Sequence, residues 1–175
     1  RKYHIKDFIL FASGISDVKN PGEFIRLAGM LPDQQFVIIG RDITKEALRE
    51  KFQVELPDNL IVMGKMPHSD LLDAIAACSV FVVTSRSEGL PTVLMEAMVL
   101  ERTVVGCNTF GTKEVIHSEE YGYIYDHLQF QDLVDKTKLA IENPKGEMAR
   151  KRILENYDWK VVIPMIDKIY ANLLQ

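Results

Sequence analysis

The chain has 175 residues, of which 47% are hydrophobic, and its 21 Lys and Arg against 25 Asp and Glu give a formal net charge of -4. These values are typical of one globular domain with its own core, and they exclude the broad positive field that attracts nucleic acid. The longest apolar stretches, such as residues 76–83, are much shorter than the roughly 18 to 20 residues of a membrane span, so we expect no transmembrane segment.

Six short segments rich in β-branched and aromatic residues predict strands, and helical patterns lie between them. Because these segments show little polar alternation, they suit strands that are covered on both faces. Strands joined by helical crossovers predict an α/β fold, a Rossmann-like doubly wound parallel sheet of about six strands with helices on both faces. In chain order the expected strands are residues 8–11, 36–39, 60–63, 80–83, 103–105 and 123–125.

Start signals mark several of the expected helices. Pro21 suits the first position of a helix, and a further helical pattern follows His68 and Ser69. After the last strand we expect helices over residues 131–142 and 144–175, with a joint at Tyr157-Asp158-Trp159.

The two cysteines, Cys78 and Cys107, lie in or beside apolar stretches that we expect to be buried. Buried reduced thiols are typical of a reducing compartment rather than of a secreted disulfide scaffold. We therefore expect a cytoplasmic protein. The sequence opens at Arg1 without an initiator Met or a charged-then-apolar leader, which favours a piece of a longer chain over a processed secretory protein.

The densest signal is S-R-S-E-G-L-P-T-V-L-M-E-A-M, residues 85–98, directly after the fourth expected strand. Doubly wound sheets bind ligands beyond the carboxyl ends of their strands, where this segment begins. Pro91 suits the first helical position, which predicts unpaired amides at residues 92–94 in a helix end that favours phosphate groups. Gly89 would let a ligand approach the backbone closely.

Two carboxylates lie eight residues apart in this segment, Glu88 in the loop and Glu96 on the helix. Glu96 is surrounded by apolar residues, so it must reach solvent or find hydrogen-bond donors. A pair of sugar hydroxyls would serve, as ribose does for the acidic residue of dinucleotide sites. The residues alone leave a second interpretation open, in which Glu96 is a surface residue beside a tight turn.

The loop after the first expected strand is small and polar, and it carries Lys19 just before a helix. This Lys is either a phosphate ligand or an exposed residue at a helix start. The chain has no zinc-ligand spacing, no G-x-x-x-x-G-K-[ST] or G-x-G-x-x-G motif, no G-x-S-x-G motif and no Asp-x-Asp. We therefore expect no metal and no cofactor, and any phosphate binding must depend on backbone amides and Lys.

Several blocks of the sequence together resemble one family. Residues 85–98, T-V-V-G-C-N-T-F-G-T-K-E-V-I (103–116) and Y-G-Y-I-Y (121–125) are similar to the donor-binding half of the GT-B glycosyltransferases of family 4, also called group 1. Further similar blocks follow the family's usual order, at residues 18–21, 31–40, 59–64 and 157–159.

The resemblance implies that residues 1–175 are the carboxyl-terminal nucleotide-sugar-binding domain of an enzyme whose amino-terminal acceptor domain is absent from this chain. It implies retaining transfer of a hexosyl group from a nucleotide diphosphate sugar, such as a UDP- or GDP-sugar, to a hydroxyl of a glycan or lipid-linked sugar, as in polysaccharide biosynthesis. The full-length protein would lie in the cytoplasm, with the inner face of the membrane as a second expected location. We expect this chain alone to bind the donor without transferring sugar.

By position in the family's motif, Glu88 would contact the hydroxyls of the donor sugar and Glu96 would hold the ribose. Lys19 matches the phosphate-binding Lys, and with Glu88 it is the expected catalytic pair. The nucleotide base would lie near Gly40, Arg41 and Met66. The remaining expected binding residues are Ser13, Gly14, Gly89, Leu90, Pro91 and Thr92.

One position departs from the family. Gly14 lies where the family usually has an Arg, five residues before Lys19, so one of the two cations expected on the diphosphate is absent. Arg41 or Arg86 would have to replace it in space. Two alternatives therefore stay open: a catalytically inactive sugar-nucleotide-binding or interaction module on the same fold, or another enzyme, such as a sugar-nucleotide epimerase.

The apolar side chains of the last helix, residues 161–174, also allow two interpretations. They either face the core of this domain or, as the resemblance implies, belong to a closing segment that crosses back onto the amino-terminal domain. In the second case they would be exposed in this chain and would favour self-association.

Overall fold

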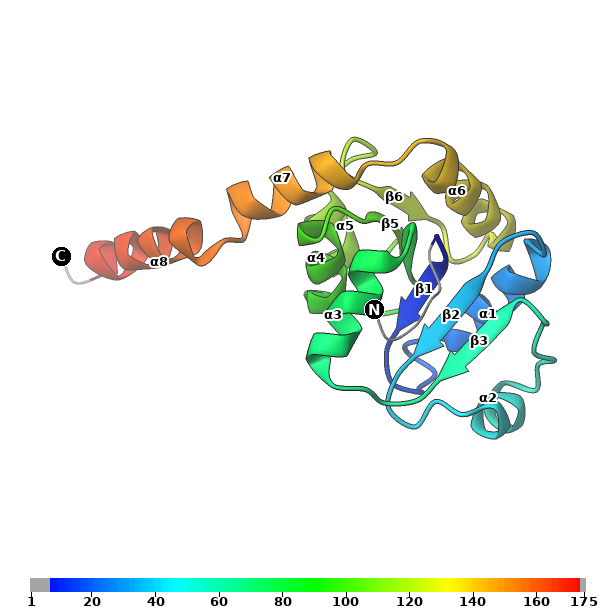
Figure 1. The fold of residues 1–175 in the computed structure, drawn as a ribbon. Coiled ribbons are helices and arrows are strands. Elements are labelled where there is room, and N and C mark those ends of the chain that lie inside the picture. The colour runs from blue at the N-terminus through cyan, green and yellow to red at the C-terminus, as the bar shows by residue number, and fades with distance from the viewer. Residues whose placement is uncertain (1–6, 174–175) are drawn as a thin grey trace.

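The computed structural model describes residues 7–173, which contain one six-stranded sheet with helices on both faces (Figure 1). Each pair of neighbouring strands is parallel, and the strand order is β3-β2-β1-β4-β5-β6. The predicted doubly wound sheet is therefore confirmed. The strands are β1 Ile9–Ala12, β2 Phe36–Ile39, β3 Leu60–Met63, β4 Val80–Val83, β5 Thr103–Cys107 and β6 Tyr123–Tyr125.

The helices follow the strands in the expected alternation. Pro21 is the first residue of its helix, as predicted. The carboxyl-terminal helical segment expected from residue 144 also divides at the predicted joint, into two helices that begin at Gly146 and Trp159 and are separated at Tyr157-Asp158. The helices are α1 Pro21–Met30, α2 Lys45–Phe52, α3 His68–Ala77, α4 Thr92–Val99, α5 Phe110–Ile116, α6 Phe130–Glu142, α7 Gly146–Asn156 and α8 Trp159–Leu173.

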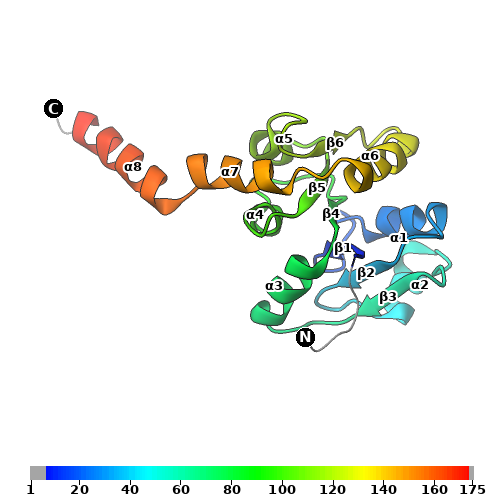
Figure 2. The same ribbon diagram turned by 45° about the horizontal axis from the view of Figure 1, so that its top comes forward.

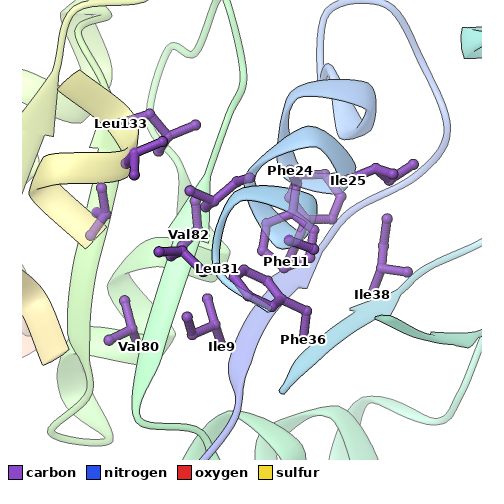
Figure 3. Close-up of a cluster of buried hydrophobic side chains, with 14 of the residues drawn as sticks. Ile9, Phe11, Phe24, Ile25, Leu31, Phe36, Ile38, Val80, Val82 and Leu133 are labelled. Carbon is purple, nitrogen blue, oxygen red and sulfur yellow. The ribbon is translucent and has the colours of Figure 1, made fainter. Parts of the chain in front are cut away.

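Alternate strand residues enter two separate apolar layers. Ile9 and Phe11 of β1 pack with Phe24 of α1 in one layer, which Figure 3 shows, while Leu10 packs with Leu94 of α4 in the other. Because successive strand side chains point to opposite faces, a strand covered on both faces needs apolar residues at every position. This explains why the strands read as continuous apolar runs in the sequence.

The two layers place different helices on the two faces of the sheet. Buried residues of α1, α2 and α6 belong to the first layer, and those of α3, α4, α5 and α7 belong to the second (Figure 2). From β1, the strands β2 and β3 are added in turn on one side, and the chain then crosses back to β4, which pairs with the other side of β1. The loops after β1 and β4 therefore lead to opposite faces, and such a switch point is where doubly wound sheets bind ligands.

The last helix, α8, extends away from the rest of the molecule beyond α7 (Figures 1 and 2). None of its described residues is buried, which agrees with the second of the two interpretations for this segment. Within residues 7–173 no helix has the length and hydrophobicity to cross a bilayer. The exposed large apolar side chains of α8 are Trp159, Ile163, Met165, Ile166, Ile169, Tyr170 and Leu173.

Candidate functional site

Lys19 and Glu88 meet at the switch point of the sheet. Lys19 lies on the loop between β1 and α1, and Glu88 lies on the loop between β4 and α4. The Lys19 Nζ atom is 2.6 Å from Glu88 Oε1, and the two side chains are 36% and 12% exposed. The pair thus brings an ammonium group, suited to phosphate, beside a carboxylate, suited to hydroxyl groups.

Hydrogen bonds hold the two loops of this pair together. The Thr84 hydroxyl, which is buried, lies 3.0 Å from the carbonyl oxygen of Lys19 and 2.9 Å from that of Asn20. The Arg86 amide donates to the Val18 carbonyl at 2.8 Å. The Lys19 backbone is therefore ordered before any ligand arrives, which lowers the entropic cost of binding.

The second carboxylate of the segment, Glu96, has a different partner. Its Oε1 atom is 3.0 Å from Nε2 of His68, the first residue of α3, and the Glu96 and His68 side chains are 32% and 64% exposed. Because a carboxylate only accepts, the imidazole donates from Nε2. Glu96 thus both reaches solvent and finds a donor. His68 was expected only as part of a helix start.

The first turn of α4 differs from the prediction. Pro91 precedes the helix as its N-cap, with φ -77° and ψ 88°, and is not the first helical residue. Its carbonyl accepts hydrogen bonds from the amides of Leu94 and Met95 at 3.1 and 3.2 Å. The expectation of a free Leu94 amide is therefore wrong, because a tight turn pairs it. Thr92 and Val93, the first two helical residues, still have no intrahelical acceptor.

The loops after β1 and β2 touch, and this contact brings four predicted residues together. A Cβ atom on Gly40 would lie 1.6 Å from the Ser13 carbonyl oxygen, so Gly40 permits an approach that no side chain would allow. A Cβ atom on Gly14 would meet the Arg41 carbonyl oxygen at 4.0 Å, an ordinary contact. The Arg41 side chain is exposed, with its Nε 3.8 Å from Asp42.

The remaining predicted residues lie at the same end of the sheet, with different exposure. Gly89, Leu90 and Thr92 are exposed beside Glu88, and Pro91 is buried. Met66 is half-buried and packs on the apolar layer that contains α3 and α4.

Gly111, which the sequence analysis did not single out, supports the Glu88 loop. Its amide donates to the Glu88 carbonyl at 3.1 Å, and a Cβ atom on it would lie 2.2 Å from the Gly89 carbonyl oxygen. The start of α5 is therefore packed directly against this loop. A glycine at the start of a helix after an expected strand was the signal that marked this close approach.

A second polar cluster, also missed, lies beneath the Lys19 loop. Glu23 Oε2 accepts hydrogen bonds from Asn20 Nδ2 at 2.8 Å and from the Tyr125 hydroxyl at 3.0 Å. Burial raises the pKa of the Glu23 carboxyl, and the hydrogen bond from Tyr125 and the charge of Arg86 oppose that increase. The cluster ties the first turn of α1 to the end of β6.

No metal centre is visible in the part of the chain that the structure describes: residues 7–173 hold no group of three His, Cys, Asp or Glu side chains placed to bind an ion. The expected absence of a metal and of a cofactor stays a prediction.

Comparisons with known proteins agree with this fold. The model of the family "Glycosyl transferases group 1" matches residues 1–159. The chain is 28% identical over 144 residues to sulfoquinovosyl transferase SQD2 of Arabidopsis thaliana, covering 78% of this chain and 28% of that protein.

Two solved structures share the fold at low identity. Sucrose-phosphate synthase of Thermosynechococcus elongatus matches with a TM-score of 0.80 and 20% identity, over 97% of this chain and 46% of that chain. Anabaena Alr3699/HepE in complex with UDP matches with a TM-score of 0.79 and 18% identity, over 95% of this chain and 49% of that chain. The chain thus spans less than half the length of each of these three proteins.

Proposed function

Because the chain belongs to the group 1 glycosyl transferases, we propose that it binds a nucleotide diphosphate sugar at the Lys19–Glu88 pair and acts as the donor-binding domain of a retaining glycosyltransferase. The ion pair at the switch point is the observation that carries this proposal. It supplies one group for the diphosphate and one for the sugar at the position where this fold binds ligands.

The proposed division of labour follows the charges of the reaction. Breaking the anomeric bond leaves negative charge on the departing diphosphate and positive charge on the sugar ring. The Lys19 ammonium and the free amides at the start of α4 stabilise the diphosphate. Glu88 accepts hydrogen bonds from the sugar hydroxyls and offsets the positive charge of the ring.

The nucleoside part of the donor lies, in this proposal, along the adjoining loops. Glu96 accepts hydrogen bonds from the ribose hydroxyls, and the loop contact between Ser13 and Gly40 forms the floor beneath the base. UDP is the first nucleotide to test, because the fold of the Anabaena protein in complex with UDP matches this chain. The acceptor, a glycan or a lipid-linked sugar, binds to a domain outside this chain.

Gly14 favours a second candidate function, a sugar-nucleotide-binding module without catalysis. The expected second cation is missing at this position, and the Arg41 side chain lies near Asp42. The charge available to stabilise a departing diphosphate is correspondingly smaller. Donor hydrolysis by the full-length protein, measured with and without acceptor, separates this module from an active transferase.

Isothermal titration calorimetry with UDP, GDP, ADP and their glucose conjugates tests the donor site on this chain. We expect saturable binding of the nucleotides that carry one of the three bases. Glu96→Ala should weaken this binding, and Glu155→Ala, which changes an exposed residue of α7, should leave it unchanged. A folded wild-type chain that binds none of these compounds would exclude the proposed donor site.

A further inference from the structure

We propose that His68 is a positioning residue that holds Glu96 for the ribose and thereby makes the site selective for nucleotides with ribose hydroxyls. The inference rests on the proposed donor-binding function and adds to it a residue and a selectivity.

The geometry leaves one carboxylate oxygen of Glu96 free for a ligand. The imidazole Nε2 of His68 lies 3.0 Å from Oε1, and the structure gives Oε2 no hydrogen bond among the residues it describes. Both side chains remain partly exposed, so a ligand can reach the pair. The hydrogen bond occupies one side of the carboxylate and directs the other side outward.

Glu96 needs such a partner because its own helix supplies none. The residues one turn away from Glu96 are Thr92, Val93 and Val99 on α4 and Leu100 just after it, of which three are apolar. A Glu side chain without a partner samples many rotamers, and each immobilised rotamer reduces the affinity for a ligand. His68 comes from α3, which packs beside α4, so the two helices together define the position of the carboxylate.

If the His68–Glu96 pair had only a structural role, its loss would have a different effect on binding. Partly exposed ion pairs contribute little to folding stability, and their loss would affect all ligands alike. A positioning role acts through the ribose hydroxyls, so its loss must affect only nucleotides that carry those hydroxyls. The two roles are separable by changing the sugar of the nucleotide.

The experiment measures, by calorimetry, the binding of UDP and GDP and of their 2′,3′-dideoxy analogues to this chain. For the nucleotide that binds, we expect His68→Ala to raise Kd about five- to tenfold, the size of effect that the loss of one ordinary hydrogen bond has, with less than about a twofold change for the dideoxy analogue. His68→Gln, whose amide can donate to Glu96, should restore much of the affinity.

Two further variants complete the test. His68→Ala added to Glu96→Ala should have no further effect, since His68 acts through Glu96. The matched control is His117→Asn, which changes an exposed His after α5, at the opposite edge of the sheet, and suits the φ of 64° at that position. It should leave both Kd values unchanged.

The possible results are distinct. An equal loss of affinity for the ribose and dideoxy forms, or no loss at all with His68→Ala, overturns the role of His68 while the donor site stands. Failure of the folded wild-type chain to bind either nucleotide overturns both the donor site and the role of His68.

Discussion

Lys19 and Glu88 are 69 residues apart in the sequence, yet their side chains form an ion pair with a distance of 2.6 Å between Nζ and Oε1. The pair neutralises Lys19 before a ligand is present. A diphosphate must therefore compete with Glu88 for the ammonium group, whereas a sugar can compensate by donating its hydroxyls to the carboxylate. This competition makes the nucleotide and the sugar parts of a donor separately measurable.

Glu88→Gln should tighten the binding of a nucleoside diphosphate and remove the additional affinity that the sugar provides. The neutral amide of Gln competes weakly for Lys19 and does not repel phosphate as the Glu88 carboxylate does. We therefore expect Kd of the diphosphate to fall about three- to tenfold. Calorimetry with UDP and UDP-glucose checks this, with Glu155→Gln as control. Weaker UDP binding by Glu88→Gln would contradict the competition.

Glu88→Gln should also reduce the turnover of the full-length transferase sharply, by about two to three orders of magnitude, because a neutral amide stabilises a positively charged sugar ring poorly. The measurement is the initial rate of transfer at saturating donor. Near-normal turnover would contradict the catalytic role of Glu88.

Gly14→Arg should tighten the binding of a nucleoside diphosphate, because it supplies the cation that the family usually has there. A Cβ atom at this position makes an ordinary contact, so the backbone accepts the substitution. We expect a gain of about 1 to 2 kcal/mol, or about five- to thirtyfold in Kd.

The matched control for this gain is Gly29→Arg, which adds the same charge on α1, where a Cβ atom meets nothing within 4 Å. Equal tightening in both variants would show that net charge, rather than a local phosphate contact, causes the gain.

Glu23→Gln should change how stability depends on pH. Burial raises the pKa of Glu23 in the folded state above its ordinary 4.5, so its contribution to stability is present below that value and is lost as pH rises through the folded-state pKa. The wild-type chain should therefore lose stability relative to Glu23→Gln as pH rises above 4.5 and through the folded-state pKa. Urea unfolding at several pH values measures this difference, and a constant difference would contradict the shift.

The two thiols should be unreactive in the folded chain. Burial raises the pKa of the Cys78 thiol to about 12 and also raises that of Cys107. At pH 8 only about one Cys78 in ten thousand is then a thiolate, the reactive form. Ellman's reagent should modify both thiols rapidly in urea and neither without it. Rapid modification of the native chain would contradict this burial.

The strands were predictable because each is apolar on both faces. Four of the predicted ranges, 36–39, 60–63, 80–83 and 123–125, agree with the structure, and β5 extends two residues beyond its predicted end to Cys107. The start of α4 was less predictable. Pro91 is compatible with both the N-cap and the first helical position, and the hydrogen bonds of its carbonyl decide between them.

By itself, the sequence determined the class of fold, and it pointed to the edge of the sheet where the site is proposed and to the candidate residues Lys19, Glu88 and Glu96, because apolar periodicity and turn residues are local signals. The tertiary structure decided which side chains meet. Glu88 pairs with Lys19, Glu96 with His68 across 28 residues, and Glu23 with Tyr125 across 102 residues. These contacts depend on the strand order and on the packing of the helices, which bring distant loops to one edge, and no local pattern encodes them.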